Sequence, residues 1–429
     1  MVYNGPMTKK DLKFNVAVVG LGYVGLPLML AISNTGLKVV GIDNNKSKID
    51  LLNRSKSYIQ DIPDLEVTNI LKSNGIFMNN KNFSGGADVW VICVPTPLTE
   101  DLKPDLSFVL NAVTFIANFI NDNDLVILES TTYPGTTDTV IVNKFNELGK
   151  FLGKDYLLAY APERVDPGQN KFAYPDIPRV VGGVDDKSAD VAVNFYSKIV
   201  RKVVKAKSSR EAEMSKLLEN TFRHINIALV NELSQFCSRL NIDIWNTIEC
   251  SETKPFGFMR FNPGPGVGGH CIPIDPNYLS YEIRNKLGQD FRFVELATKI
   301  NSEMPQVVTN RINEILQKDL KYSGHEKITL LGMSYKKNIS DTRESPSIKI
   351  SKLLVNLGYA VNYFDPLIED SLGDLEHIKR VYESRDILNS DILVILQFHD
   401  VYKEIEFEKI KLPILDMTGN LQLDNVEHI

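Results

Sequence analysis

The chain has 429 residues, of which 43% are hydrophobic and 24% charged, as in an ordinary globular protein. This length exceeds what one hydrophobic core supports, so we expect two or three domains. A net charge of −6 argues against nucleic acid as a partner. The most apolar stretch, 14–32, contains three glycines and a proline and is too short to span a membrane, and residues 1–13 contain no apolar signal core. Four cysteines without paired or metal-ligand spacing indicate a reducing, cytoplasmic location and no metal site.

The N-terminal region shows a strand, a glycine turn, a helix and a second strand. Residues 15–19 are a β-branched run, 20–25 read Gly-Leu-Gly-Tyr-Val-Gly, and Asp43 ends the second strand. In this context the glycines predict a dinucleotide site, because they permit the tight turn, the approach of a pyrophosphate and close helix packing. The Asp43 carboxylate can accept both ribose hydroxyls and would repel a 2′-phosphate, so NAD is favoured over NADP. The predicted cofactor-binding residues here are Gly20, Gly22, Tyr23, Val24, Gly25 and Asp43.

Further buried strands alternate with helical stretches, which predicts a parallel, doubly wound sheet. These strands cover 87–94, 124–129, 156–160 and 179–181. Loops rich in hydroxyl groups follow two of them, at the strand ends where ligands bind in such sheets. Thr96, Ser130 and Thr131 are therefore predicted to contact cofactor or water, although a plain structural turn could also contain them.

A long uninterrupted helix is predicted from 208 to 240, because apolar residues recur at helical spacing without Gly or Pro. Its length, on the order of 50 Å, suits a link between two domains and could carry a subunit interface. Glu213, Lys216, Asn220 and His224 form one polar stripe along it. Such stripes are usually solvated, but Asn propagates a helix poorly, so a buried Lys216–Asn220 pair that stabilises an alkoxide is the alternative.

A glycine- and proline-rich loop precedes Cys271 and Asp275. Its backbone can form neither a helix nor a central strand, so it is a shaped loop that ends in a thiol. A lone buried Cys behind a turn would be the plain interpretation. Beside a dinucleotide signature, however, a nucleophilic Cys271 indicates oxidation through a thiohemiacetal and a thioester, with Asp275 placed to hold the hydrolytic water. Glu163, just past a strand end, is a further candidate base.

A second α/β domain follows, with predicted strands at 328–332, 361–365, 391–396 and 413–416 and a helix at 345–357. The loop 334–345 carries two lysines and an arginine that serve either solubility or anion contacts. The predicted fold is α/β: two Rossmann-like doubly wound lobes joined by a long central helix and a helical middle domain. The predicted domains are 1–207, which binds NAD, 208–318, which carries the Cys loop, and 319–429, which binds substrate.

Seven motifs occur in an order that resembles the UDP-glucose/GDP-mannose 6-dehydrogenase family over nearly the whole chain. They are Gly20 to Gly25, Pro95-Thr96-Pro97, Glu129-Ser130-Thr131, Pro162-Glu163, Glu213 to Leu217 with Asn220, Gly268 to Cys271 with Asp275, and Lys336 with Asp341 to Ser345. The resemblance implies oxidation of a nucleotide-sugar C6 alcohol to the uronate, for cell-surface polysaccharide precursors, with two NAD+ consumed and Cys271 carrying the intermediates. It also implies a homodimer or larger homo-oligomer.

The resemblance also implies residue roles. Lys216, Asn220 and Asp275 would serve the alkoxide, the oxyanion and the water. Glu163 would assist as a base through Thr131 and a bound water. The further contacts implied are Pro95 and Arg343 with the cofactor, Lys336 and Gly268 with the substrate, and Arg164 and Arg260 nearest the sugar or its diphosphate.

Two departures bear on the sugar. UDP-glucose members usually have Phe where this chain has Arg164, and Lys where it has Ile274. These versions are similar to the UDP-N-acetylhexosamine branch, and UDP-N-acetylglucosamine is the expected substrate. UDP-N-acetylmannosamine, UDP-N-acetylgalactosamine and UDP-glucose stay open, since no motif reads the C2 or C4 centres. A two-electron β-hydroxyacid dehydrogenase and a nucleotide-sensing protein are the other functions considered, and neither needs Cys271.

Overall fold

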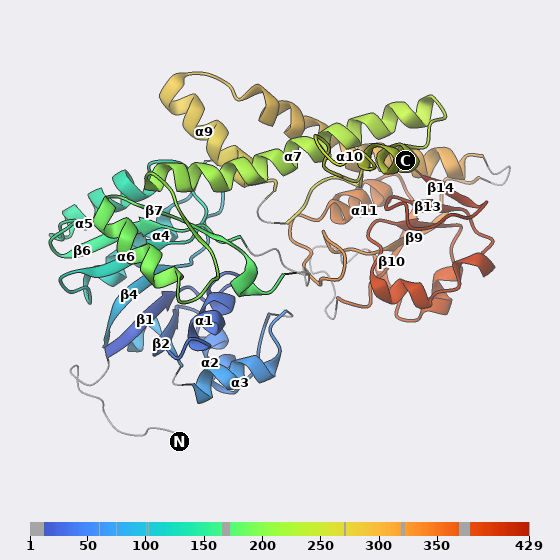
Figure 1. The fold of residues 1–429 in the computed structure, drawn as a ribbon. Helices are drawn as coiled ribbons and strands as arrows, with labels where there is room; N and C mark the ends of the chain where they lie inside the picture. Colours follow the sequence, from blue (N-terminus) through green and yellow to red (C-terminus); the bar gives the residue numbers. More distant parts are fainter. Residues whose placement is uncertain are drawn as a thin grey trace. The chain divides into compact units, whose positions relative to one another are not determined.

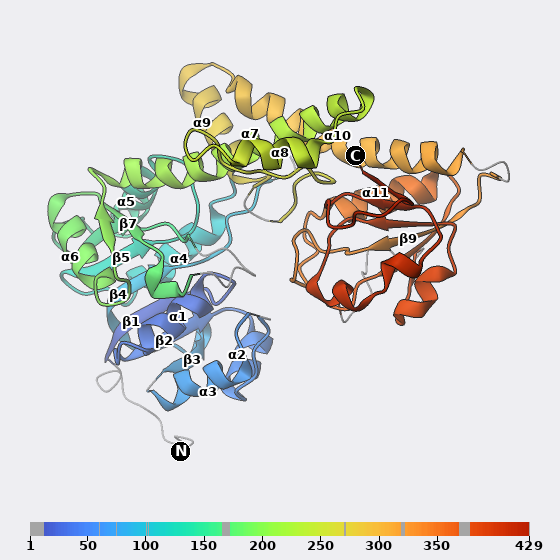
Figure 2. The same ribbon diagram turned by 45° about the vertical axis from the view of Figure 1, so that its right-hand side comes forward.

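The computed structural model describes residues 13–428 apart from 60, 74, 100, 102, 165–171, 270–271, 319–321 and 369–377. The chain forms two compact units, shown in Figures 1 and 2. The first contains Met1–Glu219 and Asn277–Gly288, and the second Asn220–Pro276 and Gln289–Ile429. In the described part of the chain, no helix is both long and apolar enough to cross a membrane. The predicted three-domain division stays a prediction.

The first unit is built on an eight-stranded sheet in the order β3-β2-β1-β4-β5-β6-β7-β8. Neighbouring strands are parallel except β6 and β7, which are antiparallel, so the predicted parallel sheet is correct with this one exception. The sequence did not predict the short strands β3 and β8. The strands are β1 Lys13–Val19, β2 Val39–Asp43, β3 Ile76–Asn79, β4 Gly86–Ile92, β5 Asp124–Leu128, β6 Tyr156–Tyr160, β7 Arg179–Gly183 and β8 Val203–Lys205.

Helices cover both faces of this sheet, as expected for a doubly wound fold (Figure 1). Alternate residues of β1 face opposite layers: Val16 and Val18 belong to the core that α1, α2, α3 and α6 share, whereas Ala17 and Val19 belong to the core that α4 and α5 share. The helices are α1 Gly25–Ser33, α2 Lys46–Asn53, α3 Asp64–Lys72, α4 Ser107–Ala117, α5 Val142–Glu147 and α6 Asp186–Tyr196. Shorter helical turns are η1 Asn80–Asn82, η2 Thr136–Ile141 and η3 Tyr174–Asp176.

The predicted long helix is confirmed as α7 Ser209–Arg239, with 31 residues. Three more helices follow: α8 Ile244–Glu252, α9 Asp275–Leu287 and α10 Arg292–Leu316. The Asp243 side chain caps α8 by accepting from the backbone N–H of Trp245 at 2.8 Å.

The second unit contains a parallel six-stranded sheet in the order β11-β10-β9-β12-β13-β14. Its elements are β9 Lys327–Leu331, α11 Pro346–Asn356, β10 Ala360–Phe364, β11 Lys379–Arg380, β12 Ile392–Ile395, β13 Ile414–Asp416 and β14 Val426–His428. Helices α10 and α11 pack on one face. Among the described residues, three 3-10 turns pack on the other: η5 Ser384–Leu388, η6 Asp400–Glu404 and η7 Phe407–Lys409.

Candidate functional site

The glycine turn between β1 and α1 has the shape of a phosphate cradle. A Cβ on Gly20, whose φ is +95°, would lie 2.5 Å from the Cys93 carbonyl oxygen, and one on Gly25 would lie 1.9 Å from the Gly20 carbonyl oxygen. A Cβ on Gly22 would meet nothing within 4 Å. The first and third glycines thus close the turn while the second leaves its backbone open. No side chain caps the N-terminus of α1, so its N–H groups are suited to a pyrophosphate.

Asp43 is held beside this turn at the end of β2. Its Oδ2 accepts from the Leu21 N–H at 3.0 Å and its Oδ1 from the Asn45 N–H at 2.8 Å. Each carboxylate oxygen still has acceptor capacity for a ribose hydroxyl. Tyr23 is exposed and Val24 half-buried on the same turn. Residues 20–43 therefore fit an adenine dinucleotide without a 2′-phosphate.

The hydroxyl-rich loops are tied to each other. Ser130 Oγ donates to the Val94 carbonyl at 2.7 Å, and the Tyr278 hydroxyl donates to the Thr96 carbonyl. These bonds fix the loops after β4 and β5. Pro95 is exposed and Thr131 half-buried at the same strand ends.

The polar stripe of α7 is buried, so the solvated interpretation is wrong. Glu213, Lys216, Asn220 and His224 are exposed by only 0, 9, 5 and 2%. Glu213 accepts from the N–H of Gly135 at 2.7 Å and of Thr137 at 2.8 Å, which ties α7 to the loop after β5. Burial raises the pKa of Glu213 to about 7 and lowers that of His224 to about 4.

In the first unit, two predicted catalytic residues lie together. Lys216 Nζ donates to the Glu163 carbonyl oxygen at 2.7 Å, so the ammonium is held just past the end of β6. The Glu163 carboxylate accepts from both Nη atoms of Arg179 at 3.3 Å. Arg164, predicted near the sugar, pairs with Glu219 at 2.7 Å and donates to the Pro178 carbonyl.

In the second unit, the Asn220 amide donates to a carboxylate oxygen of Asp275, and both side chains are buried. The Cys loop packs against the loop after β9, since a Cβ on Gly268 would lie 2.7 Å from Tyr335 Cβ. Cys271 itself lies outside the described residues.

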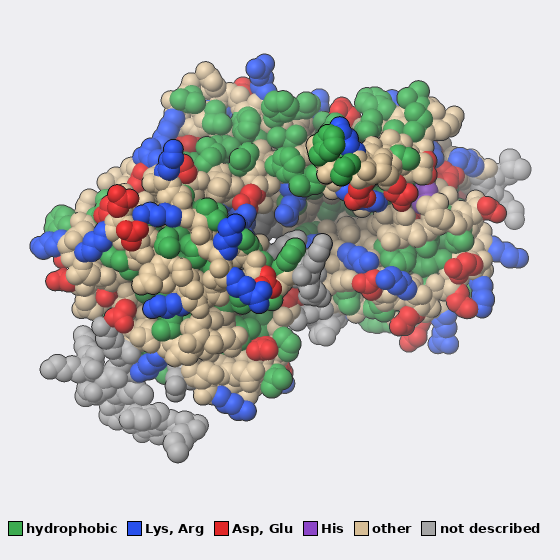
Figure 3. Space-filling model, viewed as in Figure 1, with side chains coloured by type: hydrophobic (Ala, Val, Ile, Leu, Met, Phe, Trp, Pro, Cys, Tyr) green, Lys and Arg blue, Asp and Glu red, His purple; other side chains and the backbone are tan. Residues whose placement is uncertain are grey.

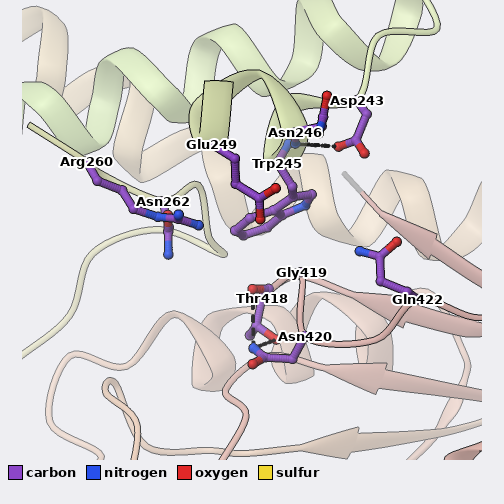
Figure 4. A pocket seen from close by; sticks show the side chains of 10 residues that line it. All are labelled: Asp243, Trp245, Asn246, Glu249, Arg260, Asn262, Thr418, Gly419, Asn420 and Gln422. Carbon is purple, nitrogen blue, oxygen red and sulfur yellow. Dashed lines mark hydrogen bonds between the residues drawn. The ribbon is translucent and has the colours of Figure 1, made fainter. Parts of the chain in front are cut away.

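The basic residues predicted for substrate and cofactor lie on loops of the second unit. Lys336 is half-buried after β9, and Arg343 is exposed and pairs with Asp341 at 2.6 Å. Arg260 pairs with Glu252 at 2.9 Å and lines a pocket of about 370 Å³. Figure 4 shows α8, the Arg260 loop and the turn after β13 around it, with Trp245 from α8 among the lining side chains.

Sequence reasoning missed a buried cluster of Glu129, Arg179 and Tyr196 behind Glu163. Glu129 belongs to one of the seven motifs, but the contacts predicted for that motif come from the hydroxyls of Ser130 and Thr131 beside it. The available signal was a charged residue at the end of each of the two strands that flank β6, Glu129 after β5 and Arg179 at the start of β7.

The similarity of this chain to known proteins extends over nearly its whole length. Three domain models of the UDP-glucose/GDP-mannose dehydrogenase family match: the NAD binding domain at 14–200, the central domain at 210–303 and the UDP binding domain at 329–423. The UDP-N-acetyl-D-mannosamine dehydrogenase of Methanocaldococcus jannaschii is 35% identical, over 94% of this chain and 90% of that protein. The NDP-N-acetyl-D-galactosaminuronic acid dehydrogenase of Ralstonia solanacearum is 31% identical, over 92% and 93%. The solved structure of the UDP-N-acetyl-D-mannosamine dehydrogenase of Pyrococcus horikoshii aligns with a TM-score of 0.86 at 31% identity, over 97% and 99%.

Replacement of Asp43 tests the cofactor site. Asp43→Ala removes the ribose acceptor and its charge, so the preference for NAD over NADP should fall by about 10- to 100-fold, the worth of a hydrogen bond to a charged group. The ratio of kcat/KM for the two cofactors measures this, with Asp50→Ala on the exposed side of α2 as the matched control. A wild-type preference for NADP would contradict the role of Asp43.

Proposed function

The chain belongs to the UDP-glucose/GDP-mannose dehydrogenase family, and from that premise we propose that it oxidises UDP-N-acetyl-D-mannosamine at C6 to the uronate. The observation that carries the proposal is the match, over more than nine-tenths of the chain, to relatives that bear this name. It favours the mannosamine alternative over UDP-N-acetylglucosamine, which the sequence motifs favoured. Because one relative is an NDP-N-acetyl-D-galactosaminuronic acid dehydrogenase, UDP-N-acetylgalactosamine is also included in the substrate panel below.

Family membership makes the protein an NAD-dependent nucleotide-sugar dehydrogenase. NAD+, when bound, supplies the hydride acceptor, and the open backbone at Gly22 and the carboxylate of Asp43 hold its pyrophosphate and ribose. Proton transfer, stabilisation of charge and covalent catalysis are carried out by side chains of this chain.

For the first oxidation, Glu163 takes the C6 hydroxyl proton, through a water held by Thr131, as hydride leaves C6. Lys216 and Asn220 stabilise the alkoxide, because the ammonium and the amide donors are buried where a charge is poorly solvated. The proximity of Lys216 Nζ to the Glu163 carbonyl supports this pairing of roles.

For the second oxidation, the Cys271 thiolate adds to the aldehyde carbon, and the resulting thiohemiacetal oxyanion would lose a hydride to a second NAD+ and so become the thioester. Water then attacks the thioester carbon, its proton passes to Asp275, and the thiolate leaves. The Asn220–Asp275 hydrogen bond supports a placed, oriented carboxylate for this step.

The nucleotide half of the substrate binds the second unit. The match at 329–423 to a UDP binding domain supports this. The Lys336 loop follows β9 and the pocket turn follows β13, and carboxyl ends of parallel strands share one edge of a sheet. Lys336 and Arg260 supply positive charge there for a diphosphate.

A second copy of the chain covers the outer face of α7. Large apolar side chains that are 40–67% exposed lie on this face: Phe222, Leu229, Leu233 and Phe236 of α7, and Leu240 just past its end. Figure 3 shows hydrophobic side chains gathered over α7. A continuous apolar stripe of this kind is typical of a helix that packs on its own copy.

A substrate panel tests the proposed reaction. NADH formation should give the highest kcat/KM with UDP-N-acetyl-D-mannosamine, by about 10- to 100-fold over its epimers and UDP-glucose, since a few contacts distinguish them. Two NADH should form per sugar. One NADH with a stable aldehyde would contradict the four-electron mechanism, and a preference for UDP-N-acetylglucosamine would contradict the choice of sugar.

Cys271→Ser should bind NAD and the UDP-sugar with unchanged affinity yet form no uronate, because a serine hydroxyl is a far weaker nucleophile than a thiolate toward the aldehyde. Calorimetry and product analysis measure the two effects. Cys250→Ser, at an exposed free cysteine, is the matched control and should behave as wild type. Uronate formation by Cys271→Ser at the normal rate would exclude the mechanism.

Leu229→Asp should halve the mass seen by light scattering, because a charge at this position, 58% exposed on α7, cannot be buried against a second copy. Leu65→Asp on α3, where the side chain is 65% exposed, should leave the mass unchanged. Equal masses for Leu229→Asp and the wild type would exclude this face as the interface.

A further inference from the structure

A buried group of charges lies behind Glu163 in the first unit. Glu129, Glu163 and Arg179 are 1, 7 and 3% exposed. Glu129 follows β5, Glu163 follows β6 and Arg179 opens β7, and these three strands are neighbours in the sheet. Burying three charges costs several kcal/mol unless their contacts compensate, so this cluster needs a balanced arrangement of charge.

Arg179 is held mainly by Glu163. Both of its Nη atoms lie 3.3 Å from Oε2 of Glu163, and Nη1 also donates to the Pro162 carbonyl at 2.8 Å. The Tyr174 hydroxyl lies 2.5 Å from Nη2. Glu129 is farther from the guanidinium, with Oε2 at 3.5 Å from Nη1. One guanidinium therefore faces two carboxylates, and among the two its side-chain hydrogen bonds go to Glu163.

Glu129 has one satisfied oxygen. Its Oε1 accepts a hydrogen bond from the Tyr196 hydroxyl, whereas no donor among the described residues forms a hydrogen bond with its buried Oε2. Burial, followed by the charge and hydrogen bond of Glu163, raises the pKa of Glu129 to about 7, against the opposing effects of Arg179 and Tyr196. Besides Tyr174 and Tyr196, two further titratable groups face this cluster: the buried Cys93 thiol, whose pKa burial raises, and Lys216, whose Nζ donates to the Glu163 carbonyl at 2.7 Å.

We infer that Glu129 is a positioning residue of this reaction: it holds a proton and donates it as a hydrogen bond to the carboxylate of the base Glu163, which also accepts hydrogen bonds from Arg179. The inference rests on the proposed function, in which Glu163 accepts the substrate proton. With Glu129 protonated, one carboxylate and one guanidinium balance each other. With Glu129 ionised, two carboxylates repel each other across a single guanidinium, and Glu163 loses a donor.

The consequence is a specific dependence of kcat on pH. In the wild type, kcat should fall by about tenfold as pH rises through 7. Glu129 then loses its proton, so the Glu163 carboxylate no longer accepts a hydrogen bond from it, and a hydrogen bond to a charged group is worth about this much. Glu129→Gln keeps an amide donor at every pH, so its kcat should stay at the low-pH value and this ionisation should vanish. Tyr196→Phe removes the donor that stabilises the Glu129 anion, so the same ionisation should move to higher pH. Tyr156→Phe is the matched control, since its hydroxyl is also fully buried but lies at the far end of β6, and it should leave the profile unchanged.

Infrared spectra of the full chain, recorded without substrate over a range of pH, measure directly whether Glu129 is protonated. The band of protonated carboxyl groups should lose amplitude as pH rises through 7, and Glu129→Gln should remove one of its components. Glu213, whose pKa is also raised to about 7, supplies the component that remains. If Glu129→Gln kept both the wild-type pH profile and the full band, the inference would be overturned. A uniform loss of rate with the wild-type profile retained would overturn it too, since that is what a merely structural role would give. Loss of the band component without turnover of any sugar nucleotide would support the proton on Glu129 and overturn the proposed function.

Discussion

The orientation of α7 is the constraint on which the rest of the molecule depends. A 31-residue helix normally exposes its polar side chains, but here Glu213, Lys216 and Asn220 are buried, whereas several large apolar side chains are exposed. Each buried polar side chain must then find a partner, because an unpaired buried donor or charge costs a few kcal/mol. Glu213 bonds the loop after β5, Lys216 bonds the Glu163 carbonyl, and Asn220 bonds Asp275. These partners are the segments that the sequence marked as chemically active.

Much of the fold could be predicted from the sequence, for a physical reason. Strands that are buried on both faces, such as β1 and β5, are continuous apolar runs, and a glycine turn has few structural alternatives. The strands that escaped prediction, such as β3 and β8, have four and three residues. Such short runs carry too little pattern to distinguish them from loops. The antiparallel pairing of β6 with β7 was equally invisible, because the direction of a strand leaves no mark on its composition.

The candidate site was predictable in its residue types but only in part in its contacts. Spacing on α7 placed Lys216 and Asn220 on one face, and the structure buries both. Spacing could not show that the Ser130 hydroxyl is used to tie two loops, since that depends on where the Val94 carbonyl lies. The Glu129–Arg179 pair stayed hidden for the same reason, because its members are 50 residues apart in the sequence and meet only through the order of strands.

Two buried carboxyl groups with raised pKa values, Glu129 and Glu213, have different hydrogen-bond partners and therefore different roles. Glu213 accepts three hydrogen bonds from Gly135 and Thr137, so its contacts favour the anion and partly offset its burial. Glu129 has one hydrogen-bond donor, Tyr196, and lies 3.5 Å from Arg179, and both of these favour its anion, whereas burial and the neighbouring Glu163 carboxylate favour its proton. The same side chain, in the same unit and equally buried, therefore anchors a helix in one place and holds a proton in the other. Under the proposed mechanism, this costly cluster of buried charges lies at the strand end that carries the base, Glu163.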